Sequence, residues 1–398
     1  MLILVLNSGS SSVKYRLFDM TEDKCLAWGI VDRIGARGSV LTQERHDGHK
    51  VKLAGEIIDH QQAIEYILAI LLSPNHGVVK DRSLIGAVGH RVVHGGEKFT
   101  GSTLITPEVM AQLHECIELA PLHNPANIKG IQACHSLMPN LPQVAVFDTA
   151  FHHKMPDYAY IYGLPYVLYK KYGVRRYGFH GTSHRYVADR AALMLNRPLN
   201  EIKLITCHLG NGCSMAAVDK GVSVDTTMGF TPTEGLLMGT RTGDLDPAAL
   251  LHIISREEIG VGEANSLINK HSGLLGVSGA SNDMREIESE VAANNPRALL
   301  ALNIFCYRVK KYIGAYAAAM NGLDGVVFTG GIGENSVIVR QKSFEGLGFL
   351  GLEFDAELNA VKSKEERFID RGSKARAMVI PTNEELVIAR DTAELVGA

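Results

Sequence analysis

The stretch LILVLNSGSSSVKYRLFD, residues 2–19, decides the fold. Residues 2–6 are continuously apolar, residues 7–12 are small or polar and contain a glycine, and apolar and polar side chains alternate from residue 13 onward. A continuous apolar run is typical of a buried strand, and strict alternation is typical of a strand with one covered face. The stretch therefore predicts a strand, a tight turn and a second strand.

The same order of residues returns about two hundred positions later. Residues 204–209 read LITCHL, residues 210–212 read GNG, and residues 213–219 read CSMAAVD. Both turns carry small or amide residues that can present backbone N–H groups. We therefore predict an internally duplicated chain, with chance recurrence of a common hairpin as the alternative.

The remaining segments predict a mixed α/β protein. Apolar periodicity favours helices at residues 60–72, 106–119, 182–195 and 295–321, and strands at 84–88, 143–147 and 325–329. A glycine-rich turn at 330–333 follows the last of these strands, and a further helix is expected after it. Near the C-terminus, Thr382 lies three residues before Glu385, which predicts a capping box and a final helix packed on the first domain.

Composition narrows the class of protein. The 398 residues include 40 Lys+Arg and 43 Asp+Glu, a net charge of −3, so there is no basic excess for nucleic acid or anionic lipid. No apolar run reaches the roughly 18 residues needed to cross a bilayer, and the apolar start is too short for an export signal. None of the six cysteines forms a CxxC pair. We expect reduced, mostly buried thiols and a cytoplasmic location.

Three glycine-bearing turns point to phosphate binding. They cover residues 7–12, 208–212 and 330–334, and each follows an apolar strand. Glycine lets the backbone approach a phosphate closely, and adjacent N–H groups donate to its oxygens. No GxxxxGK[ST] motif is present, and no GxGxxG opens a helix after the first strand, so P-loop and Rossmann interpretations fail. The turns predict a nucleotide ligand, although each taken singly is compatible with a structural hairpin.

Six motifs along the chain resemble those of the acetate kinase family: NSGSSSVK at 7–14, GHRVVHGG at 89–96, PLHNP at 121–125, FHGTSH at 179–184, MGTRTGD at 238–244 and GGIGEN at 330–335. The resemblance spans essentially the whole chain. It implies an α/β fold of the actin, Hsp70 and sugar-kinase superfamily, with two duplicated ribonuclease-H-like domains around a nucleotide cleft. We place these domains at residues 1–150 with 384–398 and at 151–383, the second binding the nucleotide.

The implied reaction is reversible, direct in-line transfer of the ATP γ-phosphoryl group to acetate, which gives acetyl phosphate and ADP. Phosphoryl transfer needs positive charge around the equatorial oxygens, and Arg91 and Arg241 lie in glycine-loosened segments suited to supply it. Carboxylic acids have a pKa of about 4, so acetate is already ionised and needs no general base. A sugar kinase would need one.

The resemblance also assigns residues. It makes Arg91, Asp148, His180 and Arg241 catalytic, His123 and His208 supporting, and Asn7 and Glu384 ligands of Mg²⁺ or Mn²⁺ in the region of Asp148. The acetate pocket falls on Arg91, Val93, Leu122, Phe179 and Pro232. Nucleotide contacts fall on Ser12, Lys14, His208, Leu209, Gly210, Asn211, Gly212, Asp283, Met284, Arg285, Gly331, Ile332, Gly333, Glu334 and Asn335. A homodimer and a role in acetyl-CoA synthesis are implied as well.

Three alternatives remain at this point. A propionate or butyrate kinase would share the mechanism, and an Hsp70- or actin-like ATPase would use the fold as a switch. A zinc hydrolase is suggested by the i, i+4 pairs His90/His94 and His180/His184. We disfavour zinc because Val92 and Val93 favour a strand, glycine follows His180, and no HExxH motif occurs.

Overall fold

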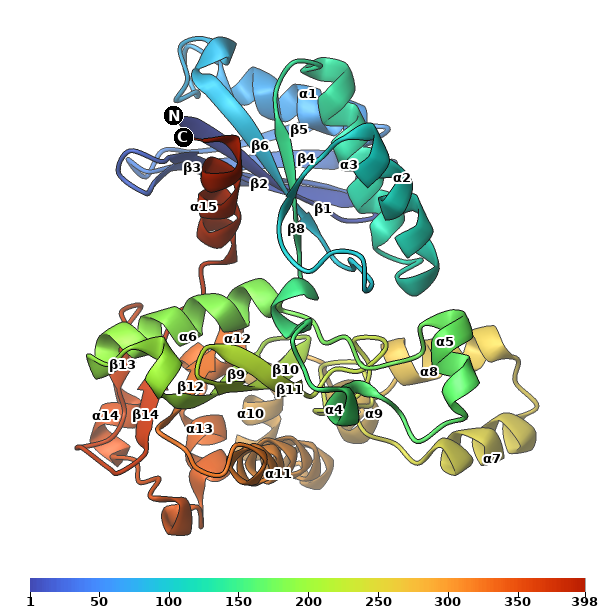
Figure 1. Cartoon of the computed structure of the whole chain (residues 1–398), viewed down its shortest axis with the longest axis vertical. Helices are drawn as coiled ribbons and strands as arrows, with labels where there is room; N and C mark the ends of the chain where they lie inside the picture. Colours follow the sequence, from blue (N-terminus) through green and yellow to red (C-terminus); the bar gives the residue numbers. More distant parts are fainter. Residues whose placement is uncertain (398) are drawn as a thin grey trace. The chain divides into compact units, whose positions relative to one another are not determined.

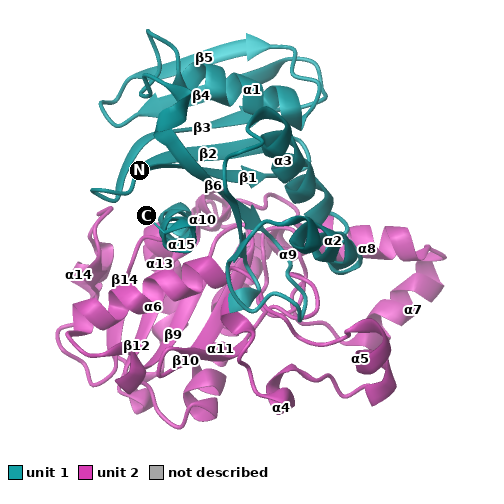
Figure 2. Cartoon of the chain, turned by 45° about the horizontal axis from the view of Figure 1, so that its top comes forward, with its two compact units in different colours: residues 1–150, 383–398 teal, residues 151–382 magenta. Residues whose placement is uncertain are grey.

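The computed structural model describes residues 1–397, which divide into two units. Unit 1 comprises Met1–Ala150 with Asn383–Ala398, and unit 2 comprises Phe151–Thr382 (Figure 2). No helix among residues 1–397 has the length and apolar character that crossing a membrane requires.

Unit 1 is built on a sheet that grows from the first hairpin. Strands β1 (Leu2–Ser8) and β2 (Ser12–Asp19) pair antiparallel from Leu2↔Asp19 to Ser8↔Val13, which confirms the predicted hairpin. The whole sheet has the order β5-β4-β3-β2-β1-β6-β8-β7. The other strands are β3 (Lys24–Asp32), β4 (Ser39–Arg45), β5 (Lys50–Gly55), β6 (Ile85–Val92), β7 (Thr103–Leu104) and β8 (Gln143–Phe147).

Unit 2 repeats this topology. Its sheet has the order β11-β10-β9-β12-β14-β13, formed by β9 (Lys203–Leu209), β10 (Cys213–Asp219), β11 (Val222–Thr226), β12 (Gly325–Thr329), β13 (Arg367–Phe368) and β14 (Arg376–Val379). In both units the first three strands form an antiparallel meander. The first strand of the meander also pairs in parallel with a fourth strand, which pairs in parallel with a fifth. The series β3-β2-β1-β6-β8 thus matches β11-β10-β9-β12-β14, which confirms the predicted duplication.

Helices cover the two faces of the unit 1 sheet. Helices α1 (His60–Leu71) and α3 (Asn124–Leu137) pack on one face over a core that includes Leu4, Val13 and Ile64. The last helix, α15 (Glu384–Val396), packs against β1, β6 and β8, as predicted (Figure 1). Helix α2 (Pro107–Glu115) packs on α3.

The predicted capping box of the last helix is wrong. The N-cap residue is Asn383, whose side chain accepts a hydrogen bond from the backbone N–H of Leu386. Thr382 cannot serve, because its hydroxyl lies 2.8 Å from that of Ser183 and its N–H donates to Glu334. The tertiary contact with Ser183 therefore engages the side chain that the local sequence pattern predicts as the cap.

The helices of unit 2 include the expected α6 (Gly181–Leu195) and α11 (Pro296–Ala319). Residues 330–333, predicted as a turn, instead begin the short helix α12 (Gly330–Asn335), because Gly330 turns the chain at φ +77° directly after β12. The expected next helix is α13 (Val337–Phe344). The others are α4 (Asp157–Tyr160), α5 (Tyr166–Tyr172), α7 (Pro247–Glu257), α8 (Val261–Lys270), α9 (Gly273–Ser278), α10 (Met284–Ala292) and α14 (Ala356–Ala360).

Candidate active site

Arg91 and Asp148 form a two-pronged ion pair in unit 1. Arg91 lies on β6 and Asp148 directly follows β8, and these parallel neighbours end side by side. Arg91 Nε donates to Asp148 Oδ1 at 2.9 Å and Nη2 donates to Oδ2 at 2.5 Å. Burial alone would lower the pKa of Arg91, but the negative charges of Asp148 and Glu384 and the hydrogen bonds to Asp148 together outweigh it, and the pKa is raised. The guanidinium is therefore held in one orientation with both carboxylate oxygens engaged.

Two sequence motifs of unit 1 contact each other around Arg91. The Asn124 side chain accepts from the N–H of His94 at 3.2 Å and donates to the His94 carbonyl at 2.9 Å. Asn127 accepts from the N–H of Val93 and donates to the carbonyl of Ser8. The start of α3 thus fixes the segment that follows Arg91. Sequence reasoning missed both asparagines, although Asn124 lies within the PLHNP motif.

Histidines and hydroxyls form a linked cluster in unit 2. His180, which precedes α6 in the left-handed conformation at φ +57°, has Nδ1 2.9 Å from Ser214 Oγ. The same Oγ lies 2.7 Å from His184 Nε2. His208 stacks on His180 with ring centroids 4.3 Å apart, and its Nδ1 lies 2.7 Å from Ser183 Oγ. The structure therefore brings the predicted residues His180 and His208 together.

The interior of this cluster is uncharged. Burial lowers the pKa of His152 to about 4 and that of His184 well below its ordinary value. Both nitrogens of His184 lie 2.7 Å from hydroxyls, those of Thr206 and Ser214. The glycine after His180 does not loosen the pair as expected, since residues 181–195 are helical. His184 is thus a buried structural group held by protein hydroxyls.

Arg241 lies beside this cluster without an acidic partner. Its Nη1 donates to the carbonyl of Pro232 at 3.1 Å, and no carboxylate within residues 1–397 forms an ion pair with it. Burial lowers its pKa. A Cβ at Gly212 would lie 3.4 Å from Arg241 Nη1 and 3.7 Å from His180 Nε2, so the turn after β9 passes close to both groups. A half-buried guanidinium without a counter-charge, beside a glycine turn, is suited to an anion.

A cavity of about 620 Å³ in unit 2 collects most of the predicted nucleotide contacts. It is lined by Gly210, Asn211, Asn282, Asp283, Met284, Arg285, Glu288, Gly331, Ile332, Asn335 and Ser336. Eight of these were predicted, whereas Asn282, Glu288 and Ser336 were missed. Asp283 caps α10 by accepting from the N–H of Arg285 at 2.9 Å. The volume lies within the range of small-molecule sites.

The other predicted nucleotide residues of unit 2 are not among the residues that line this cavity. The Glu334 carboxylate accepts from the N–H groups of Gly330 at 3.0 Å and Thr382 at 3.3 Å, so it braces the loop after β12. A Cβ at Gly330 would lie 2.8 Å from the Leu209 carbonyl oxygen, which explains the glycine there. Leu209 and Gly333 are buried. Ser12 and Lys14 belong to unit 1.

The predicted acetate pocket draws on both units. Val93 and Leu122 belong to unit 1, and Phe179 and Pro232 belong to unit 2. Val93 and Phe179 are buried, whereas Leu122 is 67% exposed. His123 is the N-cap residue of α3. Whether the four apolar residues form one pocket stays a prediction.

The predicted metal ligands, Asn7 and Glu384, offer oxygen donors of the kind that magnesium prefers. Asn7 lies near the end of β1 and Glu384 is the first residue of α15. Within residues 1–397, no three His, Cys, Asp or Glu side chains are grouped so as to hold a metal. Magnesium prefers one or two protein oxygens, completed by waters and phosphate oxygens. One amide and one carboxylate therefore suit Mg²⁺ brought by a nucleotide.

Comparisons with known proteins agree across the chain. Residues 2–390 match the model of the acetokinase family. The chain is 56% identical over 396 residues to an acetate kinase of Halothermothrix orenii, which covers 100% of both chains. Its structure resembles the crystal structures of an acetate kinase of Porphyromonas gingivalis (TM-score 0.96, 49% identity, 99% of both chains) and a propionate kinase of Francisella tularensis (TM-score 0.92, 43% identity, 99% of both chains). The chain therefore belongs to the acetokinase family.

Proposed function

We propose that this protein catalyses the reversible transfer of the γ-phosphoryl group of ATP to acetate, giving acetyl phosphate and ADP. Full-length similarity to acetate kinases supports the reaction. The observation in the structure that carries it is the half-buried guanidinium of Arg241, which has no acidic partner within residues 1–397, beside His180 and the Gly212 turn. That arrangement suits a transferring phosphoryl group, whose equatorial oxygens accumulate negative charge.

The proposed chemistry is a direct in-line displacement. A carboxylate oxygen of acetate attacks the γ-phosphorus of ATP, the bond to the β–γ bridging oxygen breaks, and ADP leaves with the electron pair. Arg91 orients the acetate carboxylate, while Arg241 and His180 stabilise the phosphoryl oxygens. Asp148 serves as the holder of Arg91, because both of its oxygens already accept from that guanidinium. This arrangement supports a carboxylate acceptor, which needs no base, over a sugar hydroxyl.

The nucleotide is proposed to occupy the cavity between α10 and α12 in unit 2. Gly331 has open space around its missing side chain, so backbone there is accessible to a ring or a phosphate. We propose that Asn7 and Glu384 hold Mg²⁺ together with the phosphate oxygens. The ion would neutralise charge on the phosphates when bound.

The acceptor is proposed to be acetate, with propionate as the nearest competitor. Val93, Leu122, Phe179 and Pro232 are apolar, as a methyl-binding site requires. One extra methylene in such a pocket changes selectivity by only about 1–3 kcal/mol, so we expect a preference rather than exclusion. Similarity to a propionate kinase structure keeps that alternative open.

A chain-length series tests the proposal. Purified protein is supplied with ATP, Mg²⁺ and either acetate, propionate or butyrate, and ADP release is followed by a coupled assay. We expect the highest kcat/KM with acetate. A higher value with propionate would reassign the acceptor, and ADP release that ignores all three acids would indicate an ATPase instead.

We further propose a cytoplasmic homodimer that serves acetyl-CoA synthesis. All six cysteines are free, which suits a reducing compartment. Light scattering on the purified chain measures the oligomeric state.

A further inference from the structure

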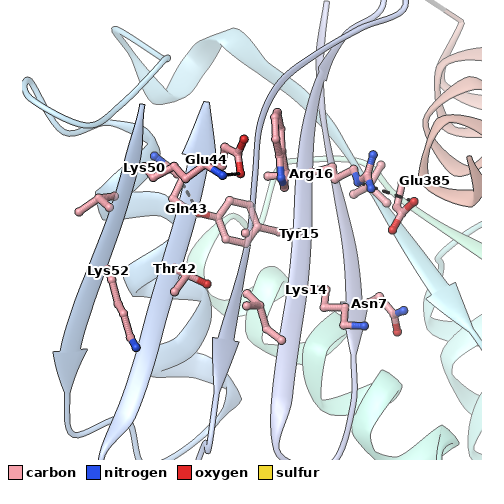
Figure 3. A pocket seen from close by; sticks show the side chains of 15 residues that line it. Asn7, Lys14, Tyr15, Arg16, Thr42, Gln43, Glu44, Lys50, Lys52 and Glu385 are labelled. Atoms are coloured by element: carbon pink, nitrogen blue, oxygen red, sulfur yellow. Dashed lines mark hydrogen bonds and ion pairs between the residues drawn. The ribbon is translucent and has the colours of Figure 1, made fainter. Parts of the chain in front are cut away.

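One face of the unit 1 sheet carries a second cavity, of about 610 Å³, of which the proposed reaction uses only Asn7 and Lys14. Helix α15 covers β1, β6 and β8, and its Glu385 forms one wall of this cavity. Figure 3 shows the rest of the cavity running across the strands toward β5. Apart from Tyr15 and Val51, the residues that line it on β1 to β5 lie outside the core under α1 and α3.

Strand pairing arranges these side chains in two parallel rows. One row runs through Val5, Arg16, Trp28, Glu44 and Lys50, which are successive cross-strand partners. The other row runs in the same way through Asn7, Lys14, Ile30, Thr42 and Lys52. We call them the Trp28 row and the Thr42 row. Neighbouring positions in the two rows lie two residues apart along a strand, about 7 Å.

The two rows differ in whether their charged side chains have ion-pair partners. In the Trp28 row, Lys50 pairs with Glu44 at 2.9 Å and Arg16 pairs with Glu385 of α15 at 3.7 Å. In the Thr42 row, neither Lys14 nor Lys52 has an ion-pair or hydrogen-bond partner within residues 1–397, and the Thr42 hydroxyl has none either. The cavity wall thus has a net charge of two positive, with the uncompensated charge on the Thr42 row.

We propose that this cavity binds the phosphate monoester of a small planar ring. The phosphate dianion lies on the Thr42 row, between Lys14 and Lys52 and within reach of the Thr42 hydroxyl. The ring lies on the Trp28 row against the half-buried indole, about 7 Å away, which matches the length of a ring joined to a phosphate. The site shares Lys14 with the proposed nucleotide contacts and contains Asn7 of the proposed Mg²⁺ site, so binding is measured in the absence of ATP and Mg²⁺.

The chain carries its own reporter for this site, because Trp28 is its single tryptophan. Titration of the full chain with phenyl phosphate, without ATP, is expected to change the indole fluorescence saturably. Inorganic phosphate, which lacks the ring, is expected to bind at least about tenfold more weakly. No saturable change with phenyl phosphate, or equal affinity for inorganic phosphate, would overturn the proposal.

Charge variants locate the site. Lys52→Glu changes an exposed residue on edge strand β5 and is expected to weaken phenyl phosphate binding at least about tenfold. Thr42→Val, a nearly isosteric change, is expected to weaken it several-fold. The matched control is Lys80→Glu, which makes the same charge change at an exposed residue of unit 1 outside the cavity wall. Equal weakening by Lys80→Glu and Lys52→Glu would show a general charge effect and refute the site.

Discussion

The two units share one topology, yet they hold their key arginines in opposite ways. In unit 1, Arg91 is neutralised by Asp148 through two hydrogen bonds. In unit 2, Arg241 is half-buried, donates to a carbonyl and has no carboxylate partner within the described chain. A paired arginine is positioned before any ligand arrives, whereas an unpaired one gains most when an anion does. The two units therefore share a backbone topology but differ in electrostatic role: unit 1 holds a positioned arginine, and unit 2 holds an arginine that lacks a counter-charge within the described residues.

Replacing Arg241 gives the largest expected effect on activity. We expect Arg241→Ala to lower kcat by on the order of 10³ or more, because the transition state loses its stabilising cation. The unfolding free energy should change by less than about 1 kcal/mol, since removing a half-buried charge that has no acidic partner in the described chain also removes its desolvation cost. Steady-state kinetics and urea unfolding measure the two effects. Arg241→Lys is the control, because it keeps the positive charge but lacks the planar guanidinium with its several donors. Near-normal turnover in Arg241→Ala would contradict the assigned role.

Replacing Asp148 should lower the stability of the protein strongly, whereas replacing Arg241 should lower mainly its turnover. Asp148→Ala leaves Arg91 partly buried without its counter-charge, so we expect a loss of about 3–5 kcal/mol in unfolding free energy as well as reduced turnover. Urea midpoints of Asp148→Ala and Arg241→Ala, measured side by side, test the comparison directly. Asp370→Ala is a matched control, because Asp370 is a buried partner of Arg376 in unit 2. Equal stability of Asp148→Ala and the unmodified chain would remove the distinction between the arginines.

Much of the fold was predictable because strand periodicity is local. The hairpin at residues 2–19 and its repeat follow from alternation alone, and the pairing confirms both. The start of α15 was missed by one position, because Thr382 and Asn383 are both good caps and only the contact with Ser183 decides between them. No sequence signal could supply that contact.

The candidate site was predictable only in part, for the same reason. Glycine turns pointed to a phosphate ligand, and the motifs pointed to most residues of the unit 2 cavity. Asn282, Glu288 and Ser336 come from separate segments that only the fold brings to one wall. The hydroxyls of Ser214 and Thr206 were missed too, because alternation shows which strand residues face inward but not which histidine each one meets.

His152, one of the buried histidines of unit 2, should make stability depend on pH. Burial depresses the pKa of His152 to about 4, below the ordinary value of about 6.5 expected for the unfolded chain. Between these values the unfolded state binds the extra proton, so stability is complete above pH 6.5 and falls as the pH drops toward 4. At pH 5 the loss is about 2 kcal/mol for this group.

Urea midpoints from pH 7.5 to 4.5 measure this dependence, and His152→Gln should flatten it. Exposed His135→Gln is the control and should leave the profile unchanged. His90→Gln sharpens the comparison between units, because His90 of unit 1 is buried with a pKa lowered to about 4 by burial. An unchanged profile in both His152→Gln and His90→Gln would show that neither histidine is the origin of acid sensitivity.

The smallest expected effect concerns Ser214, which links His180 to the buried His184. Its single O–H cannot donate to both ring nitrogens, so at least one imidazole donates to Oγ, and the bond fixes how His180 faces Arg241 and the turn. We expect Ser214→Ala to lower kcat about tenfold and to move the pH profile of kcat, with KM for ATP little changed. Ser223→Ala breaks a comparable hydroxyl–histidine bond, that of His152, and is the matched control. If both variants lower kcat equally and the pH profile does not move, Ser214 is merely structural. If the pH profile shifts only in Ser214→Ala, unit 2 positions its phosphoryl-binding groups through hydroxyls, whereas unit 1 positions its arginine through a carboxylate.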